Sequence, residues 1–232
     1  MQRKTDSQKH DLAQAVILTA QPVVFTEISK YLTEQREEIH DEGTIYQVGT
    51  FVDPRGNWQV AVVETSSGNN SAAMETERAI RQYRPSVTLF IGLAGGLKDV
   101  SVGDVVASTK LYGYESGKEN ADTFELRPNV AQASYGLEQR ARAEARKGDW
   151  RKRLDENMRA TTLRALVGPI AAGERIVGVT GSNTASFLRR NYGDALAVEM
   201  EGRGFIEAVR ANQRVEAIVI RGISNLLADK QL

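Results

Sequence analysis

The sequence contains no cysteine and only two histidines, His10 and His40, among its 232 residues. Without cysteine the chain has no disulfide framework, no thiolate nucleophile and no cysteine-ligated zinc. Two histidines leave almost no material for a histidine-rich metal site or a Ser-His-Asp triad. We therefore expect neither a metal nor a cofactor.

Neither sign of charge is in excess, because 30 Lys and Arg residues face 30 Asp and Glu residues. Non-specific binding to nucleic acid or to a membrane surface requires a basic excess, so neither partner is expected. No apolar run reaches the roughly 20 residues that cross a bilayer. The polar first ten residues also lack the apolar stretch of a signal peptide. The sequence thus predicts a soluble, cytoplasmic protein.

Proline and glycine are too sparse for a low-complexity linker, with 5 and 20 residues respectively. No internal repeat is present. A hydrophobic share of 41% with 26% charged residues is ordinary for a globular protein of this length. We expect one domain over residues 1–232, in which residues 1–14 form a polar N-terminal extension.

Short apolar runs rich in β-branched residues predict strands at residues 15–19, 60–63, 87–91, 104–108 and 215–220. Because these runs are continuous rather than alternating, both faces of each strand should be covered. Helices are predicted between them, over 22–35 and 70–83. This alternation predicts a layered α/β fold around a mixed or mainly parallel sheet.

The most concentrated charge lies between Tyr114 and Thr162. Helical spacing is plausible from Leu137 onward, where Glu138 and Arg142 form a supporting i,i+4 pair. Two interpretations remain open. The segment is either a solvated helix and excursion at the rim of the sheet, or a basic lid that meets a phosphorylated substrate.

Three polar or glycine-rich clusters follow predicted strands. The first is residues 92–96, where Leu93, Ala94 and Gly95 follow a strand directly. Glycine lets backbone amides approach ribose or phosphate oxygens, and ligands of layered α/β sheets bind beyond the carboxyl ends of strands. A tight turn with close packing is the alternative explanation.

The second cluster holds two carboxylates, Glu199 and Glu201, on either side of Met200. Paired acids after an apolar run are costly to bury unless something pairs with them. Ribose hydroxyls are natural partners, since a carboxylate accepts hydrogen bonds from neighbouring hydroxyls. Met200 could offer an apolar face to a sugar or a base. The alternative is an exposed strand end that leads into a helix over 202–210.

The third cluster is Arg221, Ser224 and Asn225, delivered to the end of the last predicted strand. The Asn225 amide offers both a donor and an acceptor, which matches the edge of a purine ring. Ser224 or Asn225 would also make a good N-cap for a helix beginning at Leu226. Both interpretations can hold together.

Taken in order, these clusters resemble the nucleoside phosphorylase superfamily. The resemblance is to methylthioadenosine/S-adenosylhomocysteine nucleosidases and to phosphorylase-like nucleosidase domains of bacterial conflict (antiphage) systems. It covers about residues 15–230 and rests on four ordered segments, residues 92–105, 112–115, 198–202 and 221–224. It implies a three-layer fold whose central sheet is mixed, mainly parallel and twisted, flanked by helices.

The resemblance further implies cleavage of the N-glycosidic bond of a purine nucleoside or nucleotide, through an oxocarbenium-like ribosyl transition state. The purine would leave after protonation at N7. The substrate-binding residues implied are Leu93, Ala94, Gly95, Ile176, Val177, Glu199, Met200, Arg221 and Ser224, with Glu201 and Asn225 as catalytic residues. Phosphate would bind at the loop that holds Gly68 and Asn69, and at Arg175.

The chain departs from this pattern at two positions. Nucleosidases of this type usually carry an aspartate at the position of Asn225, as the general acid towards N7, and a glutamate near Val24 that positions the attacking water. Glu27 is the nearest carboxylate in the sequence to Val24. An amide cannot donate a proton as an acid does. We therefore expect an impaired nucleosidase. A phosphorylase that reads a 6-oxopurine through asparagine and a non-catalytic purine-sensing module remain as alternatives.

The likeness to conflict-system proteins implies a nucleotide substrate such as ATP or AMP. Lys118, Arg127, Arg140 and Arg175 are candidate contacts for a triphosphate. Superfamily members commonly form homo-oligomers, so we expect one here. Related domains continue past the third cluster into a closing helix. This implies a truncated C-terminus or fusion to further domains.

Overall fold

The computed structural model describes residues 14–121, 124–127, 129–154, 156, 162–175, 183–212 and 214–227. The strands are β1 (Ala15–Thr19), β2 (Leu32–Ile39), β3 (Ile45–Phe51), β4 (Trp58–Glu64), β5 (Val87–Gly96), β6 (Val105–Gly113), β7 (Gly117–Glu119), β8 (Phe124–Leu126), β9 (Asn129–Gln132), β10 (Ala165–Ala172), β11 (Ala197–Glu199) and β12 (Glu216–Leu226). The helices are α1 (Pro22–Ser29), α2 (Asn69–Tyr83), α3 (Tyr135–Lys147), the 3-10 helix η2 (Asp149–Arg153), α5 (Asn183–Asn191) and α6 (Gly202–Arg210).

The main sheet is mixed, with the order β11-β10-β6-β12-β5-β1-β4-β3-β2. Its centre is parallel, because β1 pairs in parallel with β4 and β5, and β5 pairs in parallel with β12. β11 also pairs antiparallel with β5, through Ala197 with Gly96 and Val198 with Gly95. The pairings of β5, β12, β6, β10 and β11 therefore close into a ring, which places β11 beside the C-terminal end of β5.

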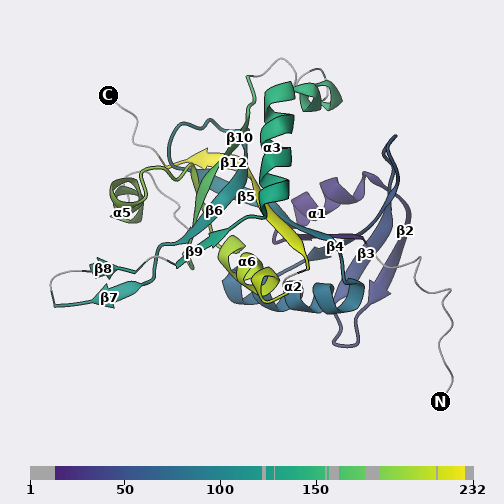
Figure 1. Ribbon diagram of the computed structural model, residues 1–232, viewed down its shortest axis with the longest axis horizontal. Helices are drawn as coiled ribbons and strands as arrows, with labels where there is room; N and C mark the ends of the chain where they lie inside the picture. Colours follow the sequence, from purple (N-terminus) through teal and green to yellow (C-terminus); the bar gives the residue numbers. More distant parts are fainter. Residues whose placement is uncertain are drawn as a thin grey trace.

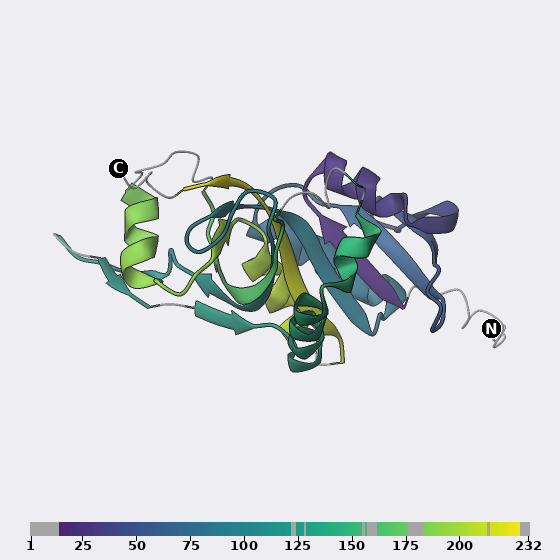
Figure 2. The same cartoon turned by 90° about the horizontal axis from the view of Figure 1, so that it is seen from above.

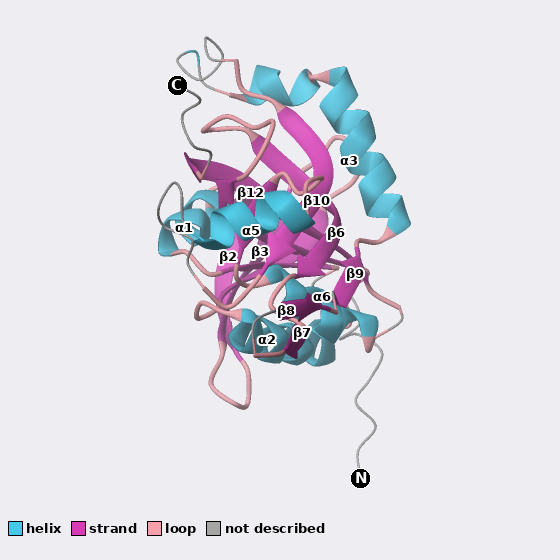
Figure 3. Cartoon of the chain, turned by 90° about the vertical axis from the view of Figure 1, so that its left-hand side faces the viewer, coloured by secondary structure: helices cyan, strands magenta, loops and turns pink. Residues whose placement is uncertain are grey.

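Helices cover both faces of the sheet (Figures 1 and 2). α2 and α6 lie side by side on one face, as Figure 3 shows. There, Phe90 of β5 meets Phe205 of α6 edge-on, with ring centroids 5.5 Å apart. On the other face, Ile28 of α1 and Leu137 of α3 pack against separate apolar clusters, the first on β1, β2 and β4 and the second on β6 and β12. The predicted α/β fold with a mixed sheet flanked by helices is confirmed.

The predicted strands and helices differ from the observed ones mainly at their ends. Residues 92–96 belong to β5, and Ser224 and Asn225 belong to β12, because these two strands pair with each other as far as Gly96 and Leu226. The tight turn and the helix cap considered for these residues are therefore wrong. The helix predicted over 22–35 ends at Ser29, since the chain then enters β2, which pairs with β3.

The charged excursion forms the β7–β8 hairpin, which projects from the body of the molecule, followed by β9, α3 and η2 (Figure 1). The helix predicted from Leu137 onward is α3, and Arg142 Nε donates to Glu138 Oε1 over 2.9 Å, as expected. Within the described part of the chain, no helix is both long and apolar enough to cross a membrane.

Candidate active site

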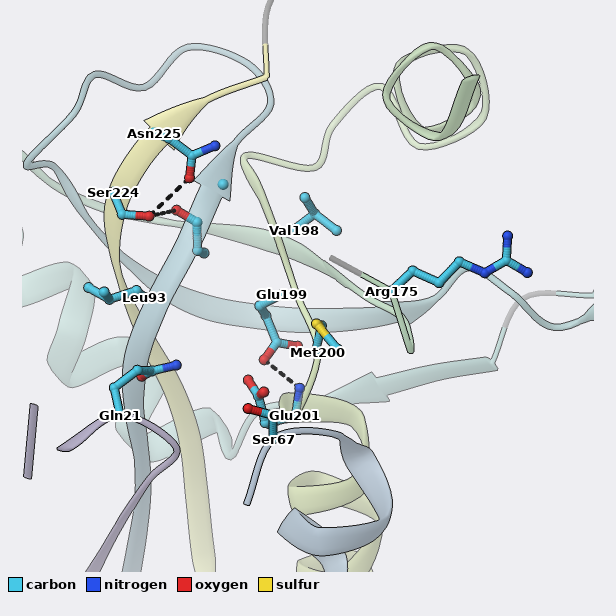
Figure 4. Close-up of a pocket in the computed structure, with 12 residues that line it drawn as sticks. Gln21, Ser67, Leu93, Arg175, Val198, Glu199, Met200, Glu201, Ser224 and Asn225 are labelled. Carbon is cyan, nitrogen blue, oxygen red and sulfur yellow. Dashed lines mark hydrogen bonds between the residues drawn. The ribbon is translucent and has the colours of Figure 1, made fainter. Parts of the chain in front are cut away.

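A small pocket lies where β5, β11 and β12 end (Figure 4). This strand-end pocket has a volume of about 210 Å³. Its lining includes most of the residues expected from the sequence, namely Leu93, Ala94, Gly95, Arg175, Glu199, Met200, Glu201, Ser224 and Asn225. Gln21, Ser67 and Val198 complete it. Segments more than 100 residues apart in the sequence thus meet in one pocket.

Glu199 is anchored inside the protein rather than free towards the pocket. Its carboxylate accepts hydrogen bonds from the backbone N–H of Glu201 at 3.0 Å and of Gly202 at 2.8 Å, at the N-terminus of α6. The same carboxylate pairs with Arg221 Nη2. With its oxygens taken up in this way, Glu199 fixes the turn that presents Glu201. Glu199 also borders the pocket, so the sugar contact expected of it would share a carboxylate that already has these internal partners.

Arg221 lies behind the pocket rather than on its wall. Its side chain is 0% exposed, and Nη2 also lies 3.3 Å from Glu201 Oε2. The guanidinium carbon sits 4.6 Å from the centre of the Phe90 ring, a cation–π contact. Arg221 therefore neutralises and positions the two acids, and the direct substrate contact expected of it is replaced by this supporting one.

Glu201 is the acid that remains available to a ligand. It accepts the backbone N–H of Gly68 over 3.3 Å and borders the pocket. Burial raises the pKa of the Glu201 carboxyl above its ordinary value; Arg221 opposes this shift and Glu199 adds to it. Glu201 thus takes up a proton at higher pH than an exposed glutamate does.

The opposite end of the pocket carries an oriented amide. The Ser224 hydroxyl donates to Asn225 Oδ1 over 3.0 Å and lies 3.4 Å from the carbonyl oxygen of Ala94 (Figure 4). Ser224 takes up one lone pair of the amide oxygen of Asn225, and the amide nitrogen offers its donors to a ligand. A neutral donor in this position can bind an acceptor on a base, but it cannot act as an acid.

The loop expected to bind phosphate has other partners. Asn69 Nδ2 donates to Gly173 O and to Glu174 Oε1, both over 2.8 Å, while Asn69 Oδ1 accepts the Gly204 N–H over 2.8 Å. The N–H of Gly68 points to Glu201. Asn69 is thus a buried clamp between α2, α6 and the end of β10. The phosphate site expected at Gly68 and Asn69 is replaced by these internal contacts.

The basic residues considered as contacts for a triphosphate do not gather at one place within a single chain. Arg175 lies at the rim of the pocket, highly exposed, with its Nε 3.4 Å from Glu115 Oε1. Arg140 lines a different cavity, and Lys118 lies on the projecting β7–β8 hairpin. The structure thus gives no support to a basic lid over this pocket. Ile176 and Val177 lie outside the described residues.

Gln21 is a pocket residue that the sequence reasoning missed. It lies two residues after the end of β1 and precedes Pro22. The signal that could have found it was this position at a strand end, as for the three clusters. Val24 lines a different cavity, beside α1. Glu27 lines that cavity too and pairs with Lys30 at 2.6 Å, so it does not supply the missing glutamate. In the described ranges no three metal-binding side chains form a cluster.

Residues 14–232 match the family model of the phosphorylase superfamily. A 5′-methylthioadenosine/S-adenosylhomocysteine nucleosidase of Haemophilus ducreyi is 28% identical over 184 residues, which cover 75% of this chain and 70% of that protein. The corresponding nucleosidase of Glaesserella parasuis is 29% identical over 185 residues, covering 75% of this chain and 71% of the relative.

Solved structures share the fold. The nucleosidase of Colwellia psychrerythraea in complex with adenine superimposes with a TM-score of 0.73 at 22% identity, covering 93% of this chain and 83% of that one. An aspartate-to-asparagine mutant of the Helicobacter pylori nucleosidase, with 5′-methylthioadenosine in the active site, gives a TM-score of 0.73 at 23% identity. That match covers 94% of this chain and 87% of the mutant.

Proposed function

The chain belongs to the phosphorylase superfamily, and from this we propose that it holds a purine nucleoside or nucleotide in the strand-end pocket and hydrolyses its N-glycosidic bond slowly. The observation that carries the proposal is that Glu201 and Asn225 line the same pocket. An acid suited to sugar hydroxyls and an amide suited to a purine edge then face one ligand. The names of the two curated relatives favour an adenine nucleoside.

The proposed reaction follows from the two ends of the pocket. Glu201 accepts hydrogen bonds from the sugar, and the nearby negative charge favours the positive charge that develops on the ribosyl group. A water oxygen bonds to C1′ while the C1′–N9 bond breaks, and the electron pair of that bond goes to the purine. The attacking water releases one proton to solvent, and the departing purine takes one proton from solvent, because Asn225 offers only a hydrogen bond. The slow step is therefore departure of the base.

Hydrolysis is favoured over phosphorolysis by the surroundings of the Gly68–Asn69 loop. The Gly68 N–H and the Asn69 side-chain amide are engaged inside the protein, and Glu201 and Glu174 lie against the loop. A phosphate dianion placed there would meet carboxylates instead of free donors. Arg175 at the rim is the pocket cation that could meet a phosphate on a nucleotide ligand.

A second function, retention of a purine ligand without cleavage, is favoured by Asn225 and Val24 together. Both the acid and the water-positioning glutamate expected of this type of nucleosidase are absent at these positions. Such a protein would act as a purine-nucleotide sensor. Cleavage by an Asn225→Asp variant distinguishes the two proposals, with free base detected by chromatography, with and without inorganic phosphate, after incubation with adenosine, inosine, AMP and ATP.

Affinity for the sugar is expected to depend on pH through Glu201. The pKa of Glu201 is raised above the ordinary glutamate value of 4.5. Its carboxylate therefore gains a proton at a higher pH than an exposed glutamate does. The acceptor for sugar hydroxyls is then lost, so adenosine should bind more weakly at low pH. Calorimetric titration from about pH 8 to 5 would measure this. Glu201→Gln should weaken binding roughly 10- to 100-fold and abolish the Glu201-dependent part of the pH profile.

An apolar surface trough supports a further proposal, that the chain forms a homo-oligomer. This trough, of about 1150 Å³, lies between α1, β4 and α3, and Val23, Tyr31 and Trp58 on it are 59%, 68% and 41% exposed. Monomers rarely expose large apolar side chains in such a group. We propose that a second copy covers them. Sedimentation velocity should then give a mass above the 25.5 kDa of one chain, and Trp58→Glu should lower it. A monomeric wild-type protein would contradict this.

A further inference from the structure

The side chain of Gln21 does not cap α1, the helix that it precedes. It is the N-cap residue of α1, yet its side chain makes no capping hydrogen bond. Its backbone is extended, with φ −125° and ψ 125°, as expected before Pro22. The carboxamide is consequently free to enter the strand-end pocket, which Gln21 lines across from Glu199 and Glu201 (Figure 4).

The oxygen of this carboxamide lies on the same side as Arg221, next to Gly92. Gln21 Oε1 is buried and has no hydrogen-bond partner among the described residues, and the same holds for Arg221 Nη1. A Cβ at Gly92 would collide with Arg221 Nη1 and lie 2.8 Å from Gln21 Oε1. The two atoms thus approach one point, and glycine leaves them that space. Since the guanidinium has donors only, it attracts the amide oxygen and turns the amide nitrogen away.

The Gln21 amide nitrogen then faces the pocket from the side opposite to the acids (Figure 4). A hydroxyl group between Gln21 and Glu201 can bind to both side chains. Its oxygen accepts a hydrogen bond from the Gln21 amide, and its hydrogen is donated to the Glu201 carboxylate. Ether, thioether and carbonyl groups cannot do this, since they have no hydrogen to donate. The pair therefore selects a hydroxyl.

We propose that Gln21 is a specificity-determining residue, whose amide nitrogen donates to the ribose hydroxyl that itself donates to Glu201. This deepens the proposed function and rests on it. Gln21 distinguishes a ribonucleoside from the deoxynucleoside that lacks this one hydroxyl. The positive charge of Arg221 favours this orientation of the amide, because it attracts the amide oxygen.

The test compares wild type with Gln21→Met, which keeps the side-chain length and removes the donor. Calorimetry would measure binding of the tighter of adenosine and inosine, of its 2′-deoxy and 3′-deoxy forms, and of the free base. The variant should bind the ribonucleoside roughly 3- to 10-fold more weakly, as expected for one lost hydrogen bond. It should bind one of the two deoxynucleosides as wild type does.

Two controls keep the result interpretable. Unchanged affinity for the free base shows that the variant pocket is intact, and Gln139→Met on the exposed face of α3 shows the effect of the same exchange elsewhere. Unchanged ribonucleoside affinity in Gln21→Met would overturn the proposal. If Gln21→Met weakened the binding of all three nucleosides equally, Gln21 would contact a bound water instead of a ribose hydroxyl. That result would also overturn the proposal. Failure of wild type to bind any nucleoside would instead refute the proposed function itself.

Discussion

The Asn225→Asp variant is expected to release free purine from a nucleoside about 10²–10⁴-fold faster than the wild-type chain. A carboxylic acid at this position can transfer a proton to N7 of the leaving base, which an amide cannot do. The exchange is nearly isosteric, and the Ser224 hydroxyl that now donates to Asn225 Oδ1 can donate to a carboxylate equally well. Initial rates of base release, followed by chromatography, measure the change.

The matched control for this variant is Asn191→Asp, which adds the same charge at the exposed end of α5, outside the pocket. It should leave the rate of base release unchanged. An increase that requires inorganic phosphate would favour a phosphorylase. Unaltered turnover in Asn225→Asp, together with retained nucleoside binding, would contradict slow hydrolysis and favour the purine sensor.

Replacing Arg221 by methionine is expected to lower the free energy of unfolding by about 3–5 kcal/mol. The loss leaves Glu199 and Glu201, which are 5% and 4% exposed, without their shared cation. A loss of this size is a large part of the roughly 5–15 kcal/mol that stabilises an ordinary domain. Urea unfolding, with the midpoint and slope fitted together, measures it.

The pH dependence of this destabilisation has a defined sign. The pKa of Glu201 is already raised in the presence of Arg221, and removal of the cation removes the main influence that lowers it. As the pH falls through this pKa the acid becomes neutral, so the penalty in Arg221→Met should shrink at lower pH. Arg210→Met is the control, because Arg210 is exposed on α6 and lies 3.5 Å from Glu207. It should change stability by at most about 0.5 kcal/mol.

The sequence was sufficient to predict the strand at residues 15–19 and the helix at 202–210, and both were observed with these bounds. It also predicted that Glu201 and Asn225 would share a pocket. The clusters' places at strand ends made a common edge of the sheet reasonable, and the resemblance to the superfamily implied that both residues act on one ligand.

Other features depend on contacts that no local pattern reveals. The pairing of β11 with β5 joins residues about 100 positions apart, and residues 33–39 form a strand because β3 is available to pair with them. The role of Asn69 was misjudged for the same reason. Its partners are Gly173, Glu174 and Gly204, which are remote in sequence.

The two ends of the strand-end pocket are built by separate hydrogen-bond networks. Arg221, Glu199 and the start of α6 hold Glu201, whereas the Ser224 hydroxyl orients Asn225. A substitution at the base end therefore leaves the grip on the sugar in place. In such a design, turnover and retention of a ligand are separable traits, and a single residue exchange can convert an enzyme into a receptor for its former substrate without rebuilding the fold.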